Sequence, residues 1–583
     1  MSAIQQLLTD HIDIWTAADT AKKSGRGRSS GNAANVYGIK KLRELILELA
    51  VRGKLVPQDE NDEPASELLK RIQVEKAKLI AEGKIKKSKP LEPITDEEMP
   101  FELPQTWKWV FLPDVSNYKV GKTPSTKSSI YWTTSGDGFN WVSIADLNHD
   151  GSVFETNKQI TDKAASEVFR CDPAPAGTIL MSFKLTLGKI SILDGPAFHN
   201  EAIISIYPNQ SIFKGFLFKV LPARAMDGNS KSAIKGNTLN SESIAALLIP
   251  LPPLTEQYRI VAKVDELMAL CDQLESQHSN ATEAHEKLVS YLLDTLTQSQ
   301  SAEDFNTNWQ RIAAHFDTLF TSETSIDALK QTLLQLAVMG KLVPQDPNDE
   351  PTSELLKRIL RERDRQIEHE GSRTIANDEI QKSEMYISAP DCWLYCRLGN
   401  IARFIDYRGK TPSKISSGIS LITAKNVRFG YISREPEEYV SATEYESWMT
   451  RGFPRVGDML FTTEAPLGNI AIVDISEKFA LAQRVICFKL HDQAIGAYLK
   501  IAIMSDHVQQ QLINASTGMT ATGIKASKLK EIPVPIPPLA EQHRIVAKID
   551  ELMVICDQLK SRFTEANQLQ QKLADVLVEQ STK

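Results

Sequence analysis

Two Gly-Lys-Thr-Pro-Ser segments, at positions 121–125 and 409–413, are the closest approach of this chain to a recognisable chemical motif. A nucleotide-binding phosphate loop needs another glycine five residues before the glycine that precedes the lysine. Ser116 and Phe404 stand there, so the spacing excludes that loop. Two alternatives stay open and carry equal weight: a turn that offers Lys and Thr to a DNA phosphate backbone, or a turn that only caps a strand.

Other candidate chemistry is weak. The chain has no Asn/Asp-Pro-Pro-aromatic, HExxH or GxSxG motif. Cys392 and Cys396 are spaced CxxxC without a second ligand pair, so we expect free, buried thiols and no metal site. His278 and His285 correspond to Phe563 and Gln570 in a second copy of the same segment, which favours packing histidines over metal ligands. The sequence therefore predicts no catalyst.

That second copy belongs to an internal duplication. Residues 42–72 match residues 329–359 at 23 of 31 positions, and residues 250–274 match 535–559 at 19 of 25. The offsets are 287 and 285, so one whole unit was duplicated. We call these four segments the repeated frame. Each copy of the frame encloses an insert, 101–249 or 390–534, that shares only scattered residues with the other insert.

The frame predicts helices. Leu42, Leu45, Ile46 and Leu49 recur at helical spacing, and Gly53 follows where a helix end favours a left-handed residue. Apolar residues then recur in a heptad pattern from Ile260 to Leu292 and from Ile545 to Leu577. The Pro-rich segment before each heptad pattern, which we call the lead-in, must have an extended backbone. The predicted seam contains Ile260, Val264, Leu267, Cys271, Leu274, Ile545, Ile549, Leu552, Cys556 and Leu559. Two matching seams predict that the two helices pair within one chain.

The inserts differ from the frame in predicted secondary structure and in charge. Segments 177–193 and 457–473 each predict two strands on either side of a Gly-containing turn, at Leu187-Gly188-Lys189 and Leu467-Gly468-Asn469. Their charge also differs from the net −7 of the whole chain: the first insert has 14 Lys and Arg against 13 Asp and Glu, and the second has 17 against 14. Near-neutral inserts are compatible with a polyanionic partner.

The composition is that of an ordinary soluble protein, with 42% hydrophobic and 24% charged residues. No apolar run is long enough to span a membrane, and the N-terminus does not resemble a signal peptide, so we expect a cytoplasmic location. Residues 1–36 include a Gly/Ser/Arg-rich stretch that predicts a flexible linker rather than a DNA-binding arm.

The duplicated frame, the PLPPLTEQYRIVAKVDEL and PIPPLAEQHRIVAKIDEL helix starts, the AVRGKLVPQ and AVMGKLVPQ helix ends and the GKTPS turns together resemble the specificity subunit of type I restriction-modification enzymes. The resemblance implies an α+β fold with two mixed α/β target-recognition domains, pseudo-twofold duplication and long conserved helices paired as an antiparallel coiled coil. The expected organisation is an N-terminal linker and helical segment (1–100), recognition domain 1 (101–249), a central helical region (250–389), recognition domain 2 (390–534) and a C-terminal helix (535–583).

The resemblance also implies a function. Each recognition domain would bind one half of an asymmetric bipartite DNA site, and the helices would set the gap and dock two methylation subunits. The subunit itself would be non-catalytic and bind no cofactor, because the methylation and restriction subunits bind S-adenosylmethionine, ATP and Mg. Candidate DNA-binding residues are Lys122, Thr123, Lys184, Lys235, Arg408, Lys410, Thr411, Arg484 and Lys525.

Two alternatives remain at this stage. The chain could be the recognition subunit of a different methylation or defence assembly, with the same DNA role but other partners. It could instead be a coiled-coil scaffold that assembles proteins without DNA. Two dissimilar β-rich inserts at parallel positions favour DNA recognition.

Overall fold

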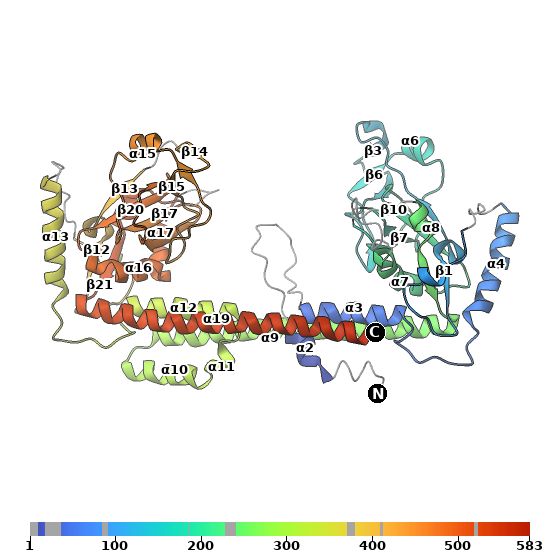
Figure 1. Ribbon diagram of the computed structural model, residues 1–583, viewed down its shortest axis with the longest axis horizontal. Coiled ribbons are helices and arrows are strands. Elements are labelled where there is room, and N and C mark those ends of the chain that lie inside the picture. The colour runs from blue at the N-terminus through green and yellow to red at the C-terminus, as the bar shows by residue number, and fades with distance from the viewer. Residues whose placement is uncertain are drawn as a thin grey trace. The chain divides into compact units, whose positions relative to one another are not determined.

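A computed structural model describes residues 10–17, 36–83, 85, 91–184, 186–227, 241–369, 379–407, 412–517 and 523–582 (Figure 1). The chain forms two compact units. Unit 1 consists of Met1–Ala281 together with Ala566–Lys583, and unit 2 is Thr282–Glu565. Both long helices, α9 (Leu254–Gln298) and α19 (Leu539–Thr582), therefore contribute one part to each unit.

Unit 1 combines a helical base with a sheet-rich domain. Its main helices are α2 (Ile12–Ala17), α3 (Tyr37–Val51), α4 (Ala65–Ala81) and α7 (Lys214–Asp227). A five-stranded sheet has the order β2-β10-β7-β8-β5, and a four-stranded sheet has the order β3-β6-β4-β9. The strands are β2 (Ser116–Val120), β3 (Trp132–Thr133), β4 (Phe139–Val142), β5 (Gly151–Val153), β6 (Lys158–Ile160), β7 (Ile179–Ser182), β8 (Ile190–Leu193), β9 (Ala197–His199) and β10 (Ile203–Pro208).

Unit 2 repeats this plan although the inserts differ in sequence. Its sheets have the orders β13-β20-β17-β18 and β14-β16-β15-β19, which match those of unit 1 strand for strand apart from β5. The strands are β13 (Ala402–Asp406), β14 (Lys414–Ile415), β15 (Ile419–Ile422), β16 (Tyr439–Val440), β17 (Met459–Thr463), β18 (Leu467–Ile472), β19 (Phe479–Leu481) and β20 (Val485–Leu490). The helices include α10 (Ala302–Ala314), α11 (Phe316–Leu319), α12 (Glu323–Val338), α13 (Thr352–His369), α16 (Gly496–Met504), α17 (Asp506–Asn514) and α18 (Ala526–Glu531). The mixed α/β inserts that the sequence predicted are confirmed.

A two-stranded ribbon fixes the start of each long helix. Strand β1 (Lys108–Phe111) pairs antiparallel with β11 (Leu248–Leu251), and β12 (Leu394–Arg397) pairs antiparallel with β21 (Pro533–Ile536). The helices α9 and α19 begin three residues after these strands, beyond two prolines. The predicted extended lead-ins are thus confirmed, and each ribbon ties the beginning of an insert to its end.

The two long helices pack antiparallel inside each unit. In unit 1, Arg43 of α3 contacts Asp272 of α9 at 2.7 Å, while farther along the chain Gln58 contacts Glu256, so the two segments run in opposite directions. Tyr37 contacts Asp575 of α19, and Lys54 reaches Thr582, so the end of α19 runs with α3 and against α9. Unit 2 has the matching contacts of α12 with α19, through Asp327 to Lys560 and Gln345 to Glu541.

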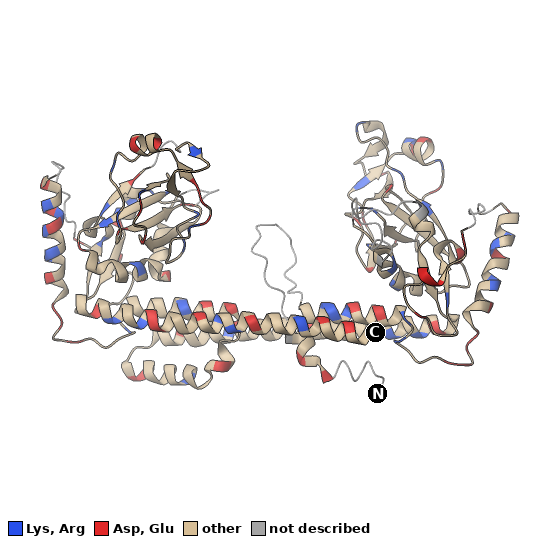
Figure 2. Ribbon diagram, viewed as in Figure 1, with Lys and Arg blue, Asp and Glu red and all other residues tan. Residues whose placement is uncertain are grey.

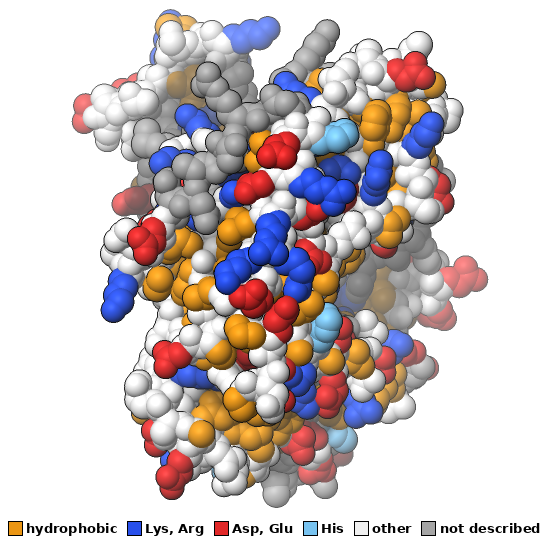
Figure 3. Space-filling model, turned by 90° about the vertical axis from the view of Figure 1, so that its left-hand side faces the viewer, with side chains coloured by type: hydrophobic (Ala, Val, Ile, Leu, Met, Phe, Trp, Pro, Cys, Tyr) orange, Lys and Arg blue, Asp and Glu red, His pale blue; other side chains and the backbone are white. Residues whose placement is uncertain are grey.

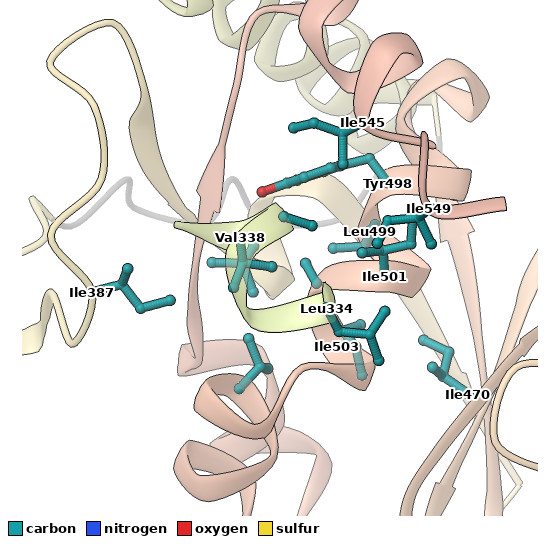
Figure 4. Packing of buried hydrophobic residues seen from close by; sticks show 14 of the residues in the cluster. Leu334, Val338, Ile387, Ile470, Tyr498, Leu499, Ile501, Ile503, Ile545 and Ile549 are labelled. Carbon is teal, nitrogen blue, oxygen red and sulfur yellow. The ribbon is translucent and has the colours of Figure 1, made fainter. Parts of the chain in front are cut away.

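The predicted seam residues form part of the hydrophobic cores. Seven of them, Ile260, Val264, Leu267, Cys271, Ile545, Ile549 and Cys556, are fully buried, and Leu274, Leu552 and Leu559 pack against the same clusters. Figure 4 shows how Ile545 and Ile549 of α19 meet Leu334 and Val338 of α12 and Tyr498, Leu499 and Ile501 of α16. The helical base and the sheet-rich domain of unit 2 therefore share one core.

In the last third of each long helix, the core-facing positions predicted from the heptad pattern are wrong by one residue. Leu288 is 49% exposed, whereas Val289 is 2% exposed and belongs to the core. The second copy behaves identically, with Leu573 exposed at 42% and Ala574 buried. An α-helix has 3.6 residues per turn rather than 3.5, so a strict heptad drifts by about 20° per repeat until the neighbouring residue faces the core.

A buried hydrogen-bonded network joins the ribbon, the frame loop and the long helix in each unit. Glu256 is almost fully buried and accepts from Trp107 Nε1 at 2.9 Å and from Gln58 Nε2 at 2.7 Å. Glu541 accepts in the same way from Trp393 at 3.0 Å and Gln345 at 2.8 Å. Burial raises the pKa of both carboxyls above the ordinary glutamate value, and the indole and amide donors oppose that shift.

An ion pair stands beside each network. Arg259 contacts Asp62 at 2.6 Å and Arg544 contacts Asp349 at 2.7 Å. The helix before each loop ends at a glycine with φ of 68°, Gly53 or Gly340. A Cβ at Gly53 would lie 2.6 Å from Cγ of Pro104, so the left-handed helix end predicted there is also a close packing contact.

Two further expectations need correction. The Gly/Ser/Arg-rich stretch at 21–35, which we predicted to be a flexible linker, lies outside the described residues, whereas residues 12–17 before it form α2 and bury Trp15 against α3. Cys392 is exposed, not buried, because it lies in a turn before β12, whereas Cys396 is buried as expected. The turn in the second insert comes before Leu467, which begins β18, so Gly468 lies inside the strand. No helix among the described residues is long and apolar enough to cross a membrane.

Candidate nucleic-acid interface

The first Gly-Lys-Thr-Pro-Ser turn is fastened to its own domain. Lys122 donates from Nζ to the carbonyl oxygens of Val168 at 2.8 Å and Phe169 at 3.3 Å, and Thr123 donates to Glu201. The turn carbonyls are used as well, since Trp132 donates to Ser125 and Trp141 donates to Lys122. These contacts favour the strand-capping alternative for this copy.

His199 lies directly behind this turn. Its carbonyl accepts from the backbone N–H of Lys122 at 2.9 Å, and a Cβ at Gly121 would lie 2.1 Å from the same oxygen. Glycine is therefore required at 121 by close approach. Burial lowers the pKa of His199 to about 4, so the imidazole is neutral and acts as packing rather than as a phosphate-binding cation.

The remaining candidates have separate surroundings. The ammonium of Lys184 lies 5.3 Å from the ring centroid of Phe183, and Arg484 forms a 2.7 Å ion pair with Glu464. Lys525 is exposed immediately before α18. The other four candidates, Lys235, Arg408, Lys410 and Thr411, lie outside the described residues. Arg484 and Lys525 lie near one another, because the backbone of Thr463 bonds both to Arg484 and to Ile524, the neighbour of Lys525. The DNA contacts of all the candidates stay predictions.

A better candidate surface is the loop segment that follows an inner strand of the sheet β3-β6-β4-β9 or β14-β16-β15-β19. Loop segment 143–155 follows β4 and includes the short strand β5, and loop segment 423–435 follows β15. Both begin with the same turn: Ser143 donates to Asp146 through its N–H and hydroxyl, and Thr423 donates to Asn426 in the same way. Although burial acts to raise it, hydrogen bonds from Ser143 and Asn157 lower the pKa of the Asp146 carboxyl.

Beyond that shared turn, the two loops expose different side chains. The second loop exposes Lys425, Arg428 and Tyr431, the last at 62%. The first loop exposes Asn148, His149, Asp150 and Phe154, the last at 69%, and Asp150 is paired with Lys219 at 3.0 Å. One scaffold thus presents two chemically distinct surfaces. Both contain Lys, Arg, Asn or aromatic side chains, which are groups that contact bases and phosphates in protein–DNA complexes.

These loop residues were missed by the sequence interpretation. The stretch Ala424–Tyr431 contains two cations and two aromatics within eight residues, which is a signal for nucleic-acid binding. The first domain offers a further missed group, because Lys158 lies 5.4 Å from the ring centroid of Trp132 on the small sheet. Trp107 and Trp393 were missed too, although they lie at equivalent positions near the start of the two inserts.

Comparison with known proteins gives consistent matches. The family model described as type I restriction modification DNA specificity domain matches twice, over residues 104–284 and 393–571. The EcoEI specificity subunit of Escherichia coli is 37% identical over 99% of both chains, and the EcoAI specificity subunit of Escherichia coli is 36% identical over 99% of both. The crystal structure of the HsdS subunit from Thermoanaerobacter tengcongensis is 18% identical, covers 83% of this chain and 98% of its own, and has a TM-score of 0.38.

The fold and these matches define a protein with two DNA specificity domains carried on one duplicated helical frame. The chain belongs to the specificity subunits of type I restriction enzymes. The resemblance predicted from the frame motifs is confirmed.

Proposed function

We propose that this chain is the non-catalytic DNA-recognition subunit of a type I restriction-modification complex, and that each domain recognises one half of an asymmetric bipartite site. The observation that carries the proposal is the pair of equivalent loops, which share a turn and differ in their exposed side chains. Different side chains on one scaffold would select different bases.

The proposal assigns the gap between the half-sites to α9 and α19. Each long helix contributes to both units. A duplicated pair of domains would suit the local dyad of duplex DNA. Two methylation subunits would dock on the repeated frame and restriction subunits would join them. These partners, with S-adenosylmethionine, ATP and Mg, would supply the chemistry. The DNA partner also supports the cytoplasmic location expected from the sequence.

The test is to map methylated adenines in cells that express the complete methylation complex. Alanine at Lys425, Arg428 and Tyr431 together should relax one half of the recognised sequence and leave the other half unchanged. The matched change at Asn148, His149 and Phe154 should relax the opposite half. If the two variants give the same methylation pattern as each other, the assignment of these loops is overturned.

The gap has its own test. Deleting one heptad within 260–292, and its equivalent within 545–577, should change or abolish the accepted gap while both half-sites stay the same. Salt titration of DNA binding by the complex separates the whole proposal from a pure scaffold, because phosphate contacts make affinity fall steeply with salt. Absence of salt-dependent DNA binding would leave only the scaffold.

A further inference from the structure

One carboxylate on the candidate DNA surface of the first domain is held by a nearly buried lysine. Asp150 lies in loop segment 143–155, and its side chain is 46% exposed. Lys219 of α7 donates to its two carboxylate oxygens, at 3.1 and 3.0 Å. The same ammonium contacts Asp265 of α9 at 3.4 Å. Two carboxylates therefore share one ammonium, so the group keeps one negative charge.

The burial of the lysine separates this pair from solvated ion pairs. Figure 2 shows acidic and basic residues alternating along α13, and Figure 3 shows basic side chains next to acidic ones on that side of the molecule. In one such pair, Lys357 and Glu354, both side chains are more than half exposed, so each can turn to solvent instead. Lys219 is only 15% exposed. An ammonium with so little access to water needs its carboxylate partners, and it therefore fixes the position of the Asp150 carboxylate.

The backbone that carries this carboxylate is fixed from behind by β8. Asp150 donates its N–H to the carbonyl of Ile190 at 3.0 Å, and the hydroxyl of Ser191 donates to the carbonyl of Asn148 at 2.6 Å. Asp150 has a φ of 59°, in the left-handed region, which Asp adopts more readily than most residues other than glycine. The side chain therefore leaves a fixed backbone, and its carboxylate is fixed by Lys219.

The second domain has the same backbone at this place but no carboxylate. Gly430 matches Asp150, because its N–H donates to a carbonyl of β18 at 2.9 Å and its φ is 98°. The lysine is retained, since GFLFK on α7 matches GAYLK on α16 and places Lys500 at the position of Lys219. A Cβ at Gly430 would lie 3.2 Å from Cε of Met504, where the first domain has the smaller Ala223. The acidic side chain and the room for it are thus features of the first domain.

A carboxylate on a surface that contacts DNA has few possible ligands there. An ionised carboxylate only accepts hydrogen bonds, and phosphate oxygens are negatively charged acceptors, so Asp150 repels the DNA backbone. In the major groove, the donors on the base edges are the exocyclic amino groups of cytosine, at N4, and of adenine, at N6. A base amino group is therefore the ligand that fits this carboxylate.

We infer that Asp150 is a specificity-determining residue for the first half-site, where it accepts a hydrogen bond from the exocyclic amino group of one cytosine or adenine, and that Lys219 is its positioning residue. This inference rests on the proposed function for the presence of DNA at loop segment 143–155. The second domain has Gly430 in place of the acid and exposes the donors Lys425 and Arg428 on its own loop segment. The first domain thus adds an acceptor where the second offers donors.

The first test maps methylated adenines in cells that express the complete methylation complex. Asp150→Ala should relax one base pair of the first half-site and leave the second half-site unchanged. Lys219→Met should relax the same base pair, whereas Lys219→Arg, which keeps a cation beside the carboxylate, should preserve it. Lys500→Met is the matched control in the second domain and should leave both half-sites as they are.

The second test identifies the amino group by removing it from the DNA. At the relaxed base pair, purine replaces adenine or 2-pyrimidinone replaces cytosine, and each analogue lacks only the exocyclic amino group. The unaltered complex should bind one of these two DNAs about tenfold more weakly than natural DNA, and the analogue that weakens binding tells which base is recognised. The complex with Asp150→Ala should bind natural and modified DNA equally.

A further variant separates recognition from folding. Asp150→Asn keeps the shape of the side chain and tolerates the left-handed backbone, so its melting temperature should match that of the unaltered chain. Its amide both donates and accepts, so it should broaden the choice of base at the same position.

The outcomes distinguish the inference from the proposed function. An unchanged first half-site in Asp150→Asn, or an equal effect of the base analogue on the unaltered complex and on Asp150→Ala, would overturn the inference. The proposed function would then still stand if alanine at Asn148, His149 and Phe154 relaxes that half-site. Failure of this triple variant to relax either half-site would instead overturn the proposed assignment of the loop segment to DNA.

Discussion

Trp107 donates its indole N–H to the buried carboxylate of Glu256 over 2.9 Å, and this bond joins the entrance of the first insert to the start of α9. Trp393 and Glu541 form the same bond at 3.0 Å in unit 2. A carboxylate that has lost its hydration must be compensated by donors of this kind. The pair therefore fixes each recognition domain to the frame at a defined point.

Replacing Trp107 with Phe should destabilise unit 1 by about 2 kcal/mol or more, because the Glu256 carboxylate loses one donor and the smaller ring leaves a void. Trp393→Phe should do the same in unit 2. Urea unfolding followed by circular dichroism measures both. Trp109→Phe is the control, since that indole donates over 3.3 Å to a half-buried carbonyl of Phe101 and should cost less. Equal effects at Trp107 and Trp109 would argue against a special role for the buried carboxylate.

His199 should make the stability of the chain sensitive to acid. Its pKa is lowered to about 4 by burial, whereas an unfolded histidine titrates near 6.5. Between these values the unfolded chain binds the additional proton, so stability falls as pH drops from about 6.5 to about 4. The total is about 3 kcal/mol at roughly 1.4 kcal/mol per pKa unit.

Substitution of His199 by Gln should reduce the slope of unfolding free energy against pH without abolishing it, because burial also lowers the pKa of His491 to about 4. The exposed His315 provides the comparison, and His315→Gln should leave the slope as it is. A slope between pH 4 and 6.5 that is unchanged in His199→Gln would contradict the contribution of His199.

The register shift in α9 predicts opposite results for adjacent residues. Val289→Ala should destabilise unit 2 by about 2 kcal/mol because Val289 is buried in the core, whereas Leu288→Ala should change stability by less than about 0.5 kcal/mol. Thermal unfolding measures both variants. A strict heptad repeat predicts the reverse order of the two stability losses. A larger loss of stability in Leu288→Ala than in Val289→Ala would therefore support the strict heptad.

Lys122 and Lys525 should respond differently in DNA binding. Lys122 is committed to two carbonyls, so Lys122→Met should lower stability by about 1 kcal/mol and leave the salt dependence of DNA binding unchanged. Lys525 is exposed within the second domain. As a phosphate contact, its replacement in Lys525→Met should reduce the slope of log affinity against log salt by about 0.9. Fluorescence anisotropy of the complex over a salt series measures both slopes, and a reduced slope for Lys122→Met would contradict its structural assignment.

Much of the fold could be predicted because its signals are local. Helix spacing around Leu42, the glycine helix end at Gly53 and the proline lead-in to α9 are set by backbone sterics and short-range periodicity. The site was harder to predict. The sequence left open whether Lys122 contacts a phosphate or belongs to a strand-capping turn, and the structure places its ammonium against the carbonyl of Val168, which is 46 residues away in sequence. A side chain's partner across such a distance has no local signature.

The sequence by itself determined that one unit was duplicated, that the frame is helical, and that the two inserts should differ in what they bind, because identity and periodicity are properties of the chain alone. Only the tertiary structure decided which residues face the core at the end of each long helix, because helical drift turns Val289 and Ala574 inward. It also decided that Glu256 is a buried acceptor and that Glu63, Glu67, Lys70 and Arg71 remain at the surface. Burial depends on what packs across the fold, and that is fixed only when distant segments meet.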